Sequence, residues 1–329
     1  MKQDDGAKSI RLDKKDRQLL FELDMNARAS LSELAKMVGL SKQSIGYRIE
    51  RLRSLGVLEG FYTVLNLPKL GVMYTRLFIE LRDVRPEIEK AIIGYASSHK
   101  EFGWIIRTEG RWDFVLVIFA RDITEIKETV NDFVLTYGAS LKSYTVSVAT
   151  AIYHFQHKYL RTERANREVV MSGRLERPTM DELDKKILRI IASEARMSLK
   201  DIGNTVGVSY KVAAYHLKRL EKEGIILAYR SSVDSEKLGN THYKVLLALQ
   251  SATSKRLEEL KSFLRFHQNV IYITEALSLS DIEFEAISSS LHEFYQLINE
   301  LRVGFSDIIM DYDTIIAVKF YRITYLPEI

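Results

Sequence analysis

The most constraining feature of this chain is an internal repeat with a fixed spacing. Gly39 aligns with Gly207, which sets an offset of 207 − 39 = 168 residues, and the same offset aligns further pairs without a gap. These are Arg28 with Arg196, Ser41 with Ser209, Tyr47 with Tyr215, Arg51 with Arg219, Gly56 with Gly224, Lys69-Leu70-Gly71 with Lys237-Leu238-Gly239, and Asp113 with Asp281. Only "LDKK", at Leu12 and Leu183, aligns with a small shift. The chain is therefore a tandem duplication, and each half is one structural unit.

Each half begins with the pattern of three short helices. Apolar residues recur at helical spacing, and hydroxyl side chains stand where helices begin. In the first half the signals are Leu12, Leu19, Leu20 and Leu23 on one face; the capping box of Ser30 and Glu33; Ser41 before the stripe Ile45, Ile49 and Leu52; and Gly56 at the end. The stretch "VLEGFYTVLN" then alternates like a small hairpin. We expect a winged helix-turn-helix, repeated from Leu183 onward.

The remainder of each half alternates between strand and helix patterns. From Val72 the order is strand, helix, strand, strand, helix and strand, and the second half repeats it from Thr241 to Tyr325. This order predicts an α+β fold with a ferredoxin-like βαββαβ unit, an antiparallel sheet with helices on one face. The expected domains are a winged helix-turn-helix at 1–65, a βαββαβ domain at 66–155, a charged linker at 156–178 that could be partly helical, a second winged helix-turn-helix at 179–234 and a second βαββαβ domain at 235–329.

Composition narrows the classes of function. The 48 Lys and Arg exceed the 44 Asp and Glu by a net charge of only +4, so any basic surface must be local. The chain has no cysteine, which excludes disulfides, thiolate nucleophiles and cysteine-ligated metal sites. The N-terminal stretch lacks the apolar core of a signal peptide, and "FVLVIFA" from Phe114 is too short to span a bilayer. We therefore expect a soluble, cytoplasmic protein.

The third helix of a helix-turn-helix can place its first turns in the major groove of DNA. Glutamine can pair with adenine and arginine with guanine, while lysine, serine and tyrosine can hold phosphates. The alternative is that these residues form an ordinary solvated helix face, or that the winged helix binds only protein. The order of helices, caps and wing favours double-stranded DNA. The residues expected to be exposed in the first copy are Lys42, Gln43, Ser44, Tyr47, Arg48 and Arg51.

The second copy presents a different set on its third helix. It has fewer groups that can recognise a base and more that can pack, so we expect a different or weaker recognition of sequence. The candidates are Tyr210, Lys211, Tyr215, His216 and Lys218, alongside Val212 and Ala214.

These residues carry a family resemblance. "LDKKDRQLL…NARASLSELAKMVGLSKQSIGYRIERLRSLGVLEGF" resembles the helix-turn-helix of the Lrp/AsnC transcription regulators, including the "R-x-S-x-x-E-L-A" and "R-I-x-R-L-x-x-x-G-V" patterns. The βαββαβ unit resembles that family's effector-binding and oligomerisation domain, called RAM or AsnC-type, and Gly110-Arg111-Trp112-Asp113 matches its marker. The resemblance covers both halves, whereas usual members carry one copy per chain.

The resemblance has two implications. Two fused copies imply a pseudo-dimer within one chain, with two readers for two half-sites about one helical turn apart, and higher oligomers stay open. It also implies a small-molecule effector, often an amino acid, near Thr108, Glu109, Gly110 and Asp113. Since the second copy has Ser278, Leu279 and Ser280 before Asp281, a surviving site would be the first. Alternatively, and in our view preferably, Gly110 and Asp113 only shape a turn.

Other functions were weighed against regulation. His154 and His157 have a spacing that could share a metal, but no third ligand is evident and a solvated strand end explains them better. "HEFYQ" at His292 lacks the second histidine of a zinc protease. We expect neither metal nor cofactor. Siroheme decarboxylases resemble this architecture, and their pocket is expected to carry His and Arg residues that bind the haem carboxylates. The strands expected at 102–119 and 270–288 hold no histidine, and only the first stretch has arginines, Arg107 and Arg111. That enzyme, and a ligand sensor acting through protein partners, are the alternatives.

Overall fold

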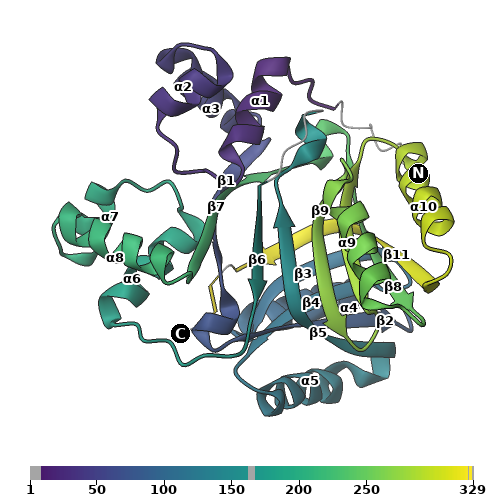
Figure 1. Cartoon of the computed structure of the whole chain (residues 1–329). Helices are drawn as coiled ribbons and strands as arrows, with labels where there is room; N and C mark the ends of the chain where they lie inside the picture. Colours follow the sequence, from purple (N-terminus) through teal and green to yellow (C-terminus); the bar gives the residue numbers. More distant parts are fainter. Residues whose placement is uncertain (1–8, 162–166, 325, 328–329) are drawn as a thin grey trace.

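The computed structural model describes residues 9–161, 167–324 and 326–327. Residues 1–8, part of the stretch that argued against a signal peptide, and residues 162–166 of the expected linker lie outside this description. Figure 1 shows two three-helix units on either side of a two-stranded ribbon, with a larger sheet assembly beyond them. No helix of the described residues is long and apolar enough to cross a membrane.

The three-helix units follow the capping signals. The first contains α1 (Lys14–Leu23), α2 (Leu31–Val38) and α3 (Lys42–Ser54), and the second contains α6 (Glu182–Ser193), α7 (Leu199–Val206) and α8 (Tyr210–Lys222). Asp13 and Asp181 cap α1 and α6 with the same capping box. They lie 181 − 13 = 168 residues apart, so the small shift expected from "LDKK" is wrong and the repeat keeps one offset to its start.

The stretch expected to fold back as a hairpin is one strand in each half. Strand β1 (Leu58–Leu65) pairs antiparallel with β7 (Ile226–Val233), so the partner of each strand comes from the other half of the chain. Gly60, the glycine of this stretch, lies within the strand and pairs with Ser232 instead of forming a turn, because the other half offers a ladder of backbone groups. The two halves are therefore joined directly beneath their three-helix units.

The remaining elements of the first half are η1 (Leu67–Leu70), β2 (Met73–Leu81), α4 (Pro86–Ser98), β3 (Phe102–Gly110), β4 (Phe114–Ala120), α5 (Ile123–Tyr137), η2 (Gly138–Ser140) and β5 (Leu141–Phe155). Those of the second half are η4 (Glu236–Leu238), β8 (Thr241–Leu249), α9 (Ser254–Phe266), β9 (Val270–Leu277), β10 (Ile282–Ser288), α10 (Leu291–Gly304) and β11 (Ile309–Ile323). Both halves thus have the predicted βαββαβ order.

The two βαββαβ units share one sheet. Its order is β2-β4-β3-β11-β8-β10-β9-β5-β6, and β2 also pairs with β5, so eight strands close into a ring that we call the barrel. The 15-residue strands β5 and β11 each pair with strands of both halves. Closure removes exposed sheet edges. Strand β4 is buried along its whole length, because one face meets the helices and the other faces the barrel interior.

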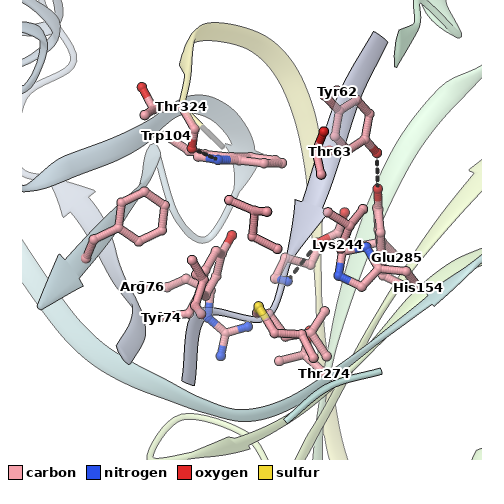
Figure 2. A pocket seen from close by; sticks show the side chains of 17 residues that line it. Tyr62, Thr63, Tyr74, Arg76, Trp104, His154, Lys244, Thr274, Glu285 and Thr324 are labelled. Atoms are coloured by element: carbon pink, nitrogen blue, oxygen red, sulfur yellow. Dashed lines mark hydrogen bonds and ion pairs between the residues drawn. The ribbon is translucent and has the colours of Figure 1, made fainter. Parts of the chain in front are cut away.

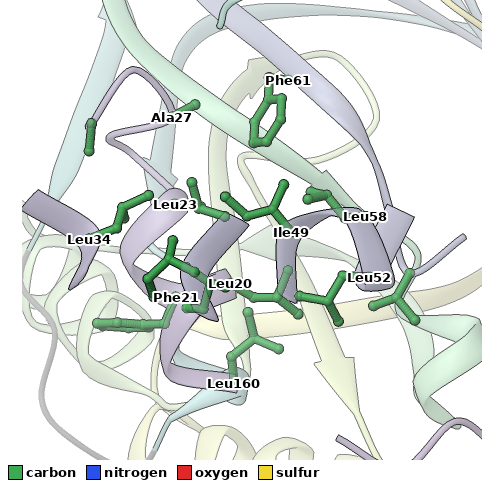
Figure 3. Close-up of a cluster of buried hydrophobic side chains, with 14 of the residues drawn as sticks. Leu20, Phe21, Leu23, Ala27, Leu34, Ile49, Leu52, Leu58, Phe61 and Leu160 are labelled. Carbon is green, nitrogen blue, oxygen red and sulfur yellow. The ribbon is translucent and has the colours of Figure 1, made fainter. Parts of the chain in front are cut away.

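The core of each three-helix unit is completed by the other half. Figure 3 shows the first core, in which Leu20, Ile49 and Leu52 surround residues that reach in from outside the helices, including Phe61 and Leu160. Ala195 and Leu238 of the second half belong to the same cluster. The second unit packs in turn against Leu65, Leu67, Leu70 and Val72 of the first half. Neither helical unit could detach without exposing apolar surface.

Backbone contacts between the halves are reciprocal. The amide of Ala27 donates to the carbonyl of Tyr229 (2.9 Å), and the amide of Ala195 donates to the carbonyl of Phe61 (3.1 Å). Arg28 donates to the carbonyls of Ala195 and Met197, while Arg196 donates to those of Ala27 and Ala29. The aligned arginines of the repeat therefore join the two helical units to each other.

The segment between the halves is part of the fold. The described residues of 156–178, expected as a charged linker that could be partly helical, contain the short 3-10 helix η3 (Lys158–Leu160) and also the strand β6 (Glu168–Ser172), which pairs with the end of β5. Strand β5 extends past the end of β2, which leaves an edge that β6 covers.

Candidate functional site

The exposed face of α3 begins directly after its N-cap. Ser41 accepts a hydrogen bond from the amide of Ser44 (3.2 Å), and its hydroxyl also contacts the Ser44 hydroxyl. Lys42 and Gln43 are exposed, Ser44 is half-buried, and the Tyr47 ring is 70% exposed. A helix start with exposed lysine, amide and hydroxyl groups can hold phosphate and contact base edges.

Arg48 and Arg51 were expected on this face, but both are engaged inside the helical unit. Arg48 Nη1 contacts Asp13 Oδ2 (2.7 Å) and Asp16 Oδ1 (2.6 Å), and Arg51 binds the same Asp16 carboxylate. The Asp16 side chain is only 1% exposed, so its charge requires a paired cation. The hydrogen bond to Asp13 raises the pKa of Arg48. The prediction that Arg48 and Arg51 are exposed is met only in part, because their side chains are 21% and 35% exposed and fasten α3 to α1; their contact with DNA stays a prediction.

The second copy keeps these contacts between its first and third helices, with one substitution. His216 replaces Arg48, is buried, and its Nδ1 lies 2.8 Å from Asp184 Oδ1, while Arg219 binds both Asp181 and Asp184. His216 is therefore not available to DNA, contrary to the prediction. Tyr210, Lys211, Tyr215 and Lys218 are exposed as expected. Among the described residues, Asp181, Asp184 and His216 could converge on a cation, but Arg219 already neutralises the carboxylates.

The hairpin between β3 and β4, the expected effector site, is held by internal hydrogen bonds. Thr108 is buried and donates its hydroxyl to the carbonyl of Trp112 (2.6 Å). Asp113 accepts from the amide of Leu81 (2.7 Å), and burial raises the pKa of this carboxyl. Glu109, by contrast, has an exposed carboxylate.

Gly110 of the same hairpin lies close to β11. It has φ +122°, and a Cβ there would stand 2.7 Å from the carbonyl oxygen of Thr314. In the second half, Asp281 keeps the aspartate contact by accepting from the amide of Leu249 (2.7 Å), while Ser278 adopts φ +111° without a glycine. These contacts suit the alternative that Gly110 and Asp113 shape the turn.

A cavity that the sequence analysis missed lies between β1 and the barrel, and both halves line it. Figure 2 shows aromatic and charged side chains around it, including Trp104, Tyr74, Arg76, His154 and Lys244. Its lining also includes Tyr62, Phe119, Ile152, Met171, Tyr272 and Glu285. We call this the interior cavity.

The charges at the interior cavity form a closed network. Arg76 Nη1 lies 2.5 Å from Glu283 Oε2, and Lys244 Nζ lies 2.8 Å from the same oxygen. Lys244 also contacts Glu285 (3.1 Å), which His242 approaches at 2.8 Å. Burial would raise the pKa of Glu283, but the Arg76 and Lys244 charges hold it below its ordinary value. Two cations thus balance two carboxylates.

His154 has unused hydrogen-bonding capacity in this cavity, as does the Nε of Arg76. Both ring nitrogens are shielded from solvent and have no hydrogen-bond partner, and the ring stands edge-on to Tyr272 at 5.0 Å between centroids. Burial lowers the pKa of His154 to about 3, so the ring is neutral at pH 7. The expectation that His154 and His157 lie at a solvated strand end is wrong. His157 is buried as well, and its amide donates to Asp24.

The wall of the cavity is connected to the first helical unit. The Tyr272 hydroxyl lies 3.4 Å from that of Tyr62 and 3.4 Å from Arg230 Nη1. Arg230 in turn binds the carboxylate of Asp24, the C-cap of α1, through Nε (2.7 Å) and Nη2 (2.9 Å). Asp24 and Arg230 are completely buried. A contact at Tyr272 is therefore two residues away from the end of α1.

The signals that could have indicated this cavity are weak in the sequence. The histidine spacing singled out His154, and alternation along β5 places it on the same side as Ile152, but its neighbour Tyr272 is paired with it only through the β5–β9 register. The strands compared for histidines did not include β5 or β8, which contribute His154 and Lys244.

Comparisons with known proteins agree with the repeated architecture. The AsnC-type helix-turn-helix domain matches residues 12–53, and a winged helix-turn-helix DNA-binding domain matches residues 180–226. An uncharacterized HTH-type transcriptional regulator of Pyrococcus furiosus is 30% identical over 125 residues, 38% of this chain and 83% of that protein. The proline dehydrogenase transcriptional activator of Rhodobacter capsulatus is 29% identical over 144 residues, 42% of this chain and 92% of that protein.

Two solved structures of one protein match both halves together. The siroheme decarboxylase NirDL aligns over 96% of this chain and 94% of its own, with a TM-score of 0.62 and 12% sequence identity. At that identity the likeness describes the fold alone.

Proposed function

The chain belongs to the Lrp/AsnC family of transcription regulators, and we propose that it binds its operator through α3 and α8 as two readers held in one chain. The observation that carries this proposal is the exposed start of α3, where Lys42, Gln43 and Tyr47 project beyond a helix whose arginines are occupied elsewhere. We assign Lys42 and Tyr47 to phosphates and Gln43 to a base edge. Such a regulator would act in the cytoplasm.

The pseudo-dimer is supported by the reciprocal contacts between the halves. Arg28 and Arg196 hold the two helical units against each other, and β1 pairs with β7 beneath them. A fixed pair of readers favours two half-sites about one helical turn apart. Because α8 presents Tyr210, Lys211 and Tyr215 instead of the α3 set, we expect the half-sites to differ.

The experiment is selection of random duplexes on the full chain, followed by titration of the enriched duplex at rising salt. An enriched two-part motif is the expected result, and a single half-site would make α8 idle. Lys42→Ala should weaken binding and lower the slope of log K against log salt by about 1, since one phosphate contact is lost. Lys127→Ala, at an exposed lysine of α5, is the matched control and should bind as the wild type does.

Gln43→Ala separates base recognition from phosphate contact. It should reduce discrimination between the enriched duplex and a scrambled one while leaving the salt slope unchanged. If no motif is enriched, sequence-specific recognition is refuted. A sensor acting through protein partners would then lead, because its function would not depend on Lys42.

A siroheme decarboxylase-like enzyme is the second candidate, and one observation favours it. The interior cavity carries His154, Arg76 and Lys244, although the strands compared in the sequence hold no histidine. Incubation of the purified chain with siroheme, followed by absorption spectroscopy, tests this candidate directly. Binding without loss of carboxylate groups would exclude decarboxylation while leaving siroheme as a ligand.

A further inference from the structure

We propose that the interior cavity is the effector site of this regulator and that it takes an uncharged aromatic molecule of about one ring, signalling to α1 through Tyr272 and Arg230. This rests on the proposed regulatory function, since an effector has meaning only if the chain binds DNA. It places the effector away from the β3–β4 hairpin and differs from the amino acid that the family resemblance implies.

The walls of the cavity specify an aromatic ligand. Five aromatic rings from five different strands line it, and Ile152 and Met171 complete the apolar surface. Aromatic walls bind flat rings through offset or edge-to-face contacts, and a thioether adds a favourable contact with a ring edge. The rings are Tyr62, Tyr74, Trp104, Phe119 and Tyr272.

The charges around the cavity argue for an uncharged ligand. Arg76 and Lys244 are neutralised by Glu283 and Glu285 at 2.5–3.1 Å, so neither sign is left in excess. A carboxylate or ammonium group would lose its hydration on entry and would add an unbalanced charge to this neutralised network, in which the Nε of Arg76 is the one charged donor without a hydrogen bond among the four residues named. An amino acid carries both groups and would meet this cost twice.

His154 supplies the hydrogen bond that fixes the ligand. A neutral imidazole has one donor and one acceptor, and here both ring nitrogens lack partners. A hydroxyl on the ring of the ligand can satisfy either nitrogen. Shielded polar groups without partners are rare in native structures and usually mark a ligand, water or ion site.

The size of the cavity limits the ligand further. Its volume is about 90 Å³, whereas an engineered apolar cavity of about 150 Å³ in another protein holds benzene. By this comparison even one ring requires a small movement of the walls, and one ring is therefore the upper limit. A tetrapyrrole is several times larger and would require a different arrangement of β1 and the barrel.

The route to DNA runs through a short buried chain of contacts. A ligand beside His154 also lies beside Tyr272, whose hydroxyl contacts Tyr62 and Arg230. Arg230 binds Asp24, the C-cap of α1, so a shift of Tyr272 that moves Arg230 also changes the position of the first helical unit. The repeat does not duplicate this pair: the first half has Tyr62 at the position of Arg230, and the second half has Ala192 at the position of Asp24. The signal should therefore reach α3 and not α8.

The test begins with ligand binding to the full chain without DNA. Phenol is the probe, and tyrosine, which carries the same ring on an amino acid, is the charged comparison; both are titrated calorimetrically in the millimolar range. Phenol should bind and tyrosine should not. His154→Phe should weaken phenol binding about fivefold or more, because a hydrogen bond in a shielded site is lost. His154→Gln should restore part of the affinity, and His292→Ala, at an exposed histidine of α10, should change nothing.

The second measurement is the affinity for the selected duplex with and without phenol. In the wild type this affinity should change about fivefold or more, a typical coupling between two sites. Tyr272→Phe should still bind phenol but lose the change. Absence of phenol binding, equal binding in His154→Phe, preference for tyrosine, or binding of siroheme in this cavity would each overturn the ligand class. DNA binding without phenol binding refutes this inference and leaves the regulator intact, whereas loss of specific DNA binding refutes the regulator.

Discussion

The substitution Asp24→Ala should destabilise the chain strongly, because it leaves a buried guanidinium without its counter-charge. Asp24 accepts hydrogen bonds from Arg230 Nε (2.7 Å), from Arg230 Nη2 (2.9 Å) and from the amide of His157 (2.7 Å). Both charged side chains are 0% exposed. Removing one partner of such a pair costs about 3–5 kcal/mol. That is a fifth or more of the about 5–15 kcal/mol that stabilises an ordinary domain.

The free energy of unfolding should be measured by urea titration at pH 7, with circular dichroism for the helices and tryptophan fluorescence for the barrel, since Trp104 and Trp112 both lie there. Arg230→Met combined with Asp24→Ala should cost less than Asp24→Ala alone, because no unpaired charge remains. Lys142→Ala is the control for an exposed ion pair, that with Glu80, and should cost less than about 1 kcal/mol.

The pH dependence gives an independent check. Burial opposes the Asp24 charge, but Arg230 and His157 outweigh it and hold the pKa of Asp24 below its ordinary 3.8. A depressed carboxyl pKa contributes stability above the unfolded value, and this contribution is lost as the pH falls through the folded value. The difference between wild type and Asp24→Ala should therefore be constant from pH 7 to 5 and shrink below about pH 4. A loss under 1 kcal/mol, or a difference unaffected by acid, would refute the buried-pair reasoning.

Three further predictions concern other parts of the fold. Arg51→Ala should destabilise the first helical unit by about 1.5–3 kcal/mol in the same urea assay, because the contact with Asp16 is lost. The slope of log K against log salt for DNA binding should match that of the wild type if Arg51 does not contact phosphate. Gly110→Ala should lower the melting temperature, because a Cβ would meet the Thr314 carbonyl, whereas Ser278→Gly should raise it by relieving a strained φ; equal shifts would contradict this. Burial lowers the pKa of His154 to about 3, so protonation of this ring favours the unfolded state. The free energy of unfolding should therefore be unaffected by His154 above pH 6.5 and should fall by about 1.4 kcal/mol per pH unit below it. His154→Phe should flatten this dependence on pH in urea titrations at pH 7, 5.5 and 4.5.

The helical units illustrate which features could be anticipated along the chain. Ser30 and Ser41 act as caps where the sequence placed them, because a cap depends on backbone groups within about four residues. The βαββαβ order followed from the period of the apolar residues for the same reason. The prediction of which α3 residues are exposed was only partly correct. Helical spacing put Arg48 and Arg51 on the outer face, but it could not reveal that Asp16 of α1 would lie against them.

The repeat, the helices, the strands and the family were all legible in residues a few positions apart, together with one constant offset of 168 between the halves. Long-range pairing decided the rest: β1 meets β7 instead of folding back, β6 covers the end of β5, and Asp24 finds Arg230. The interior cavity belongs to this second class, since His154 and Tyr272 become neighbours only when β5 pairs with β9. Such contacts depend on the register in which strands of the two halves pair to form one barrel. The periodicity of residues within either half does not determine that register.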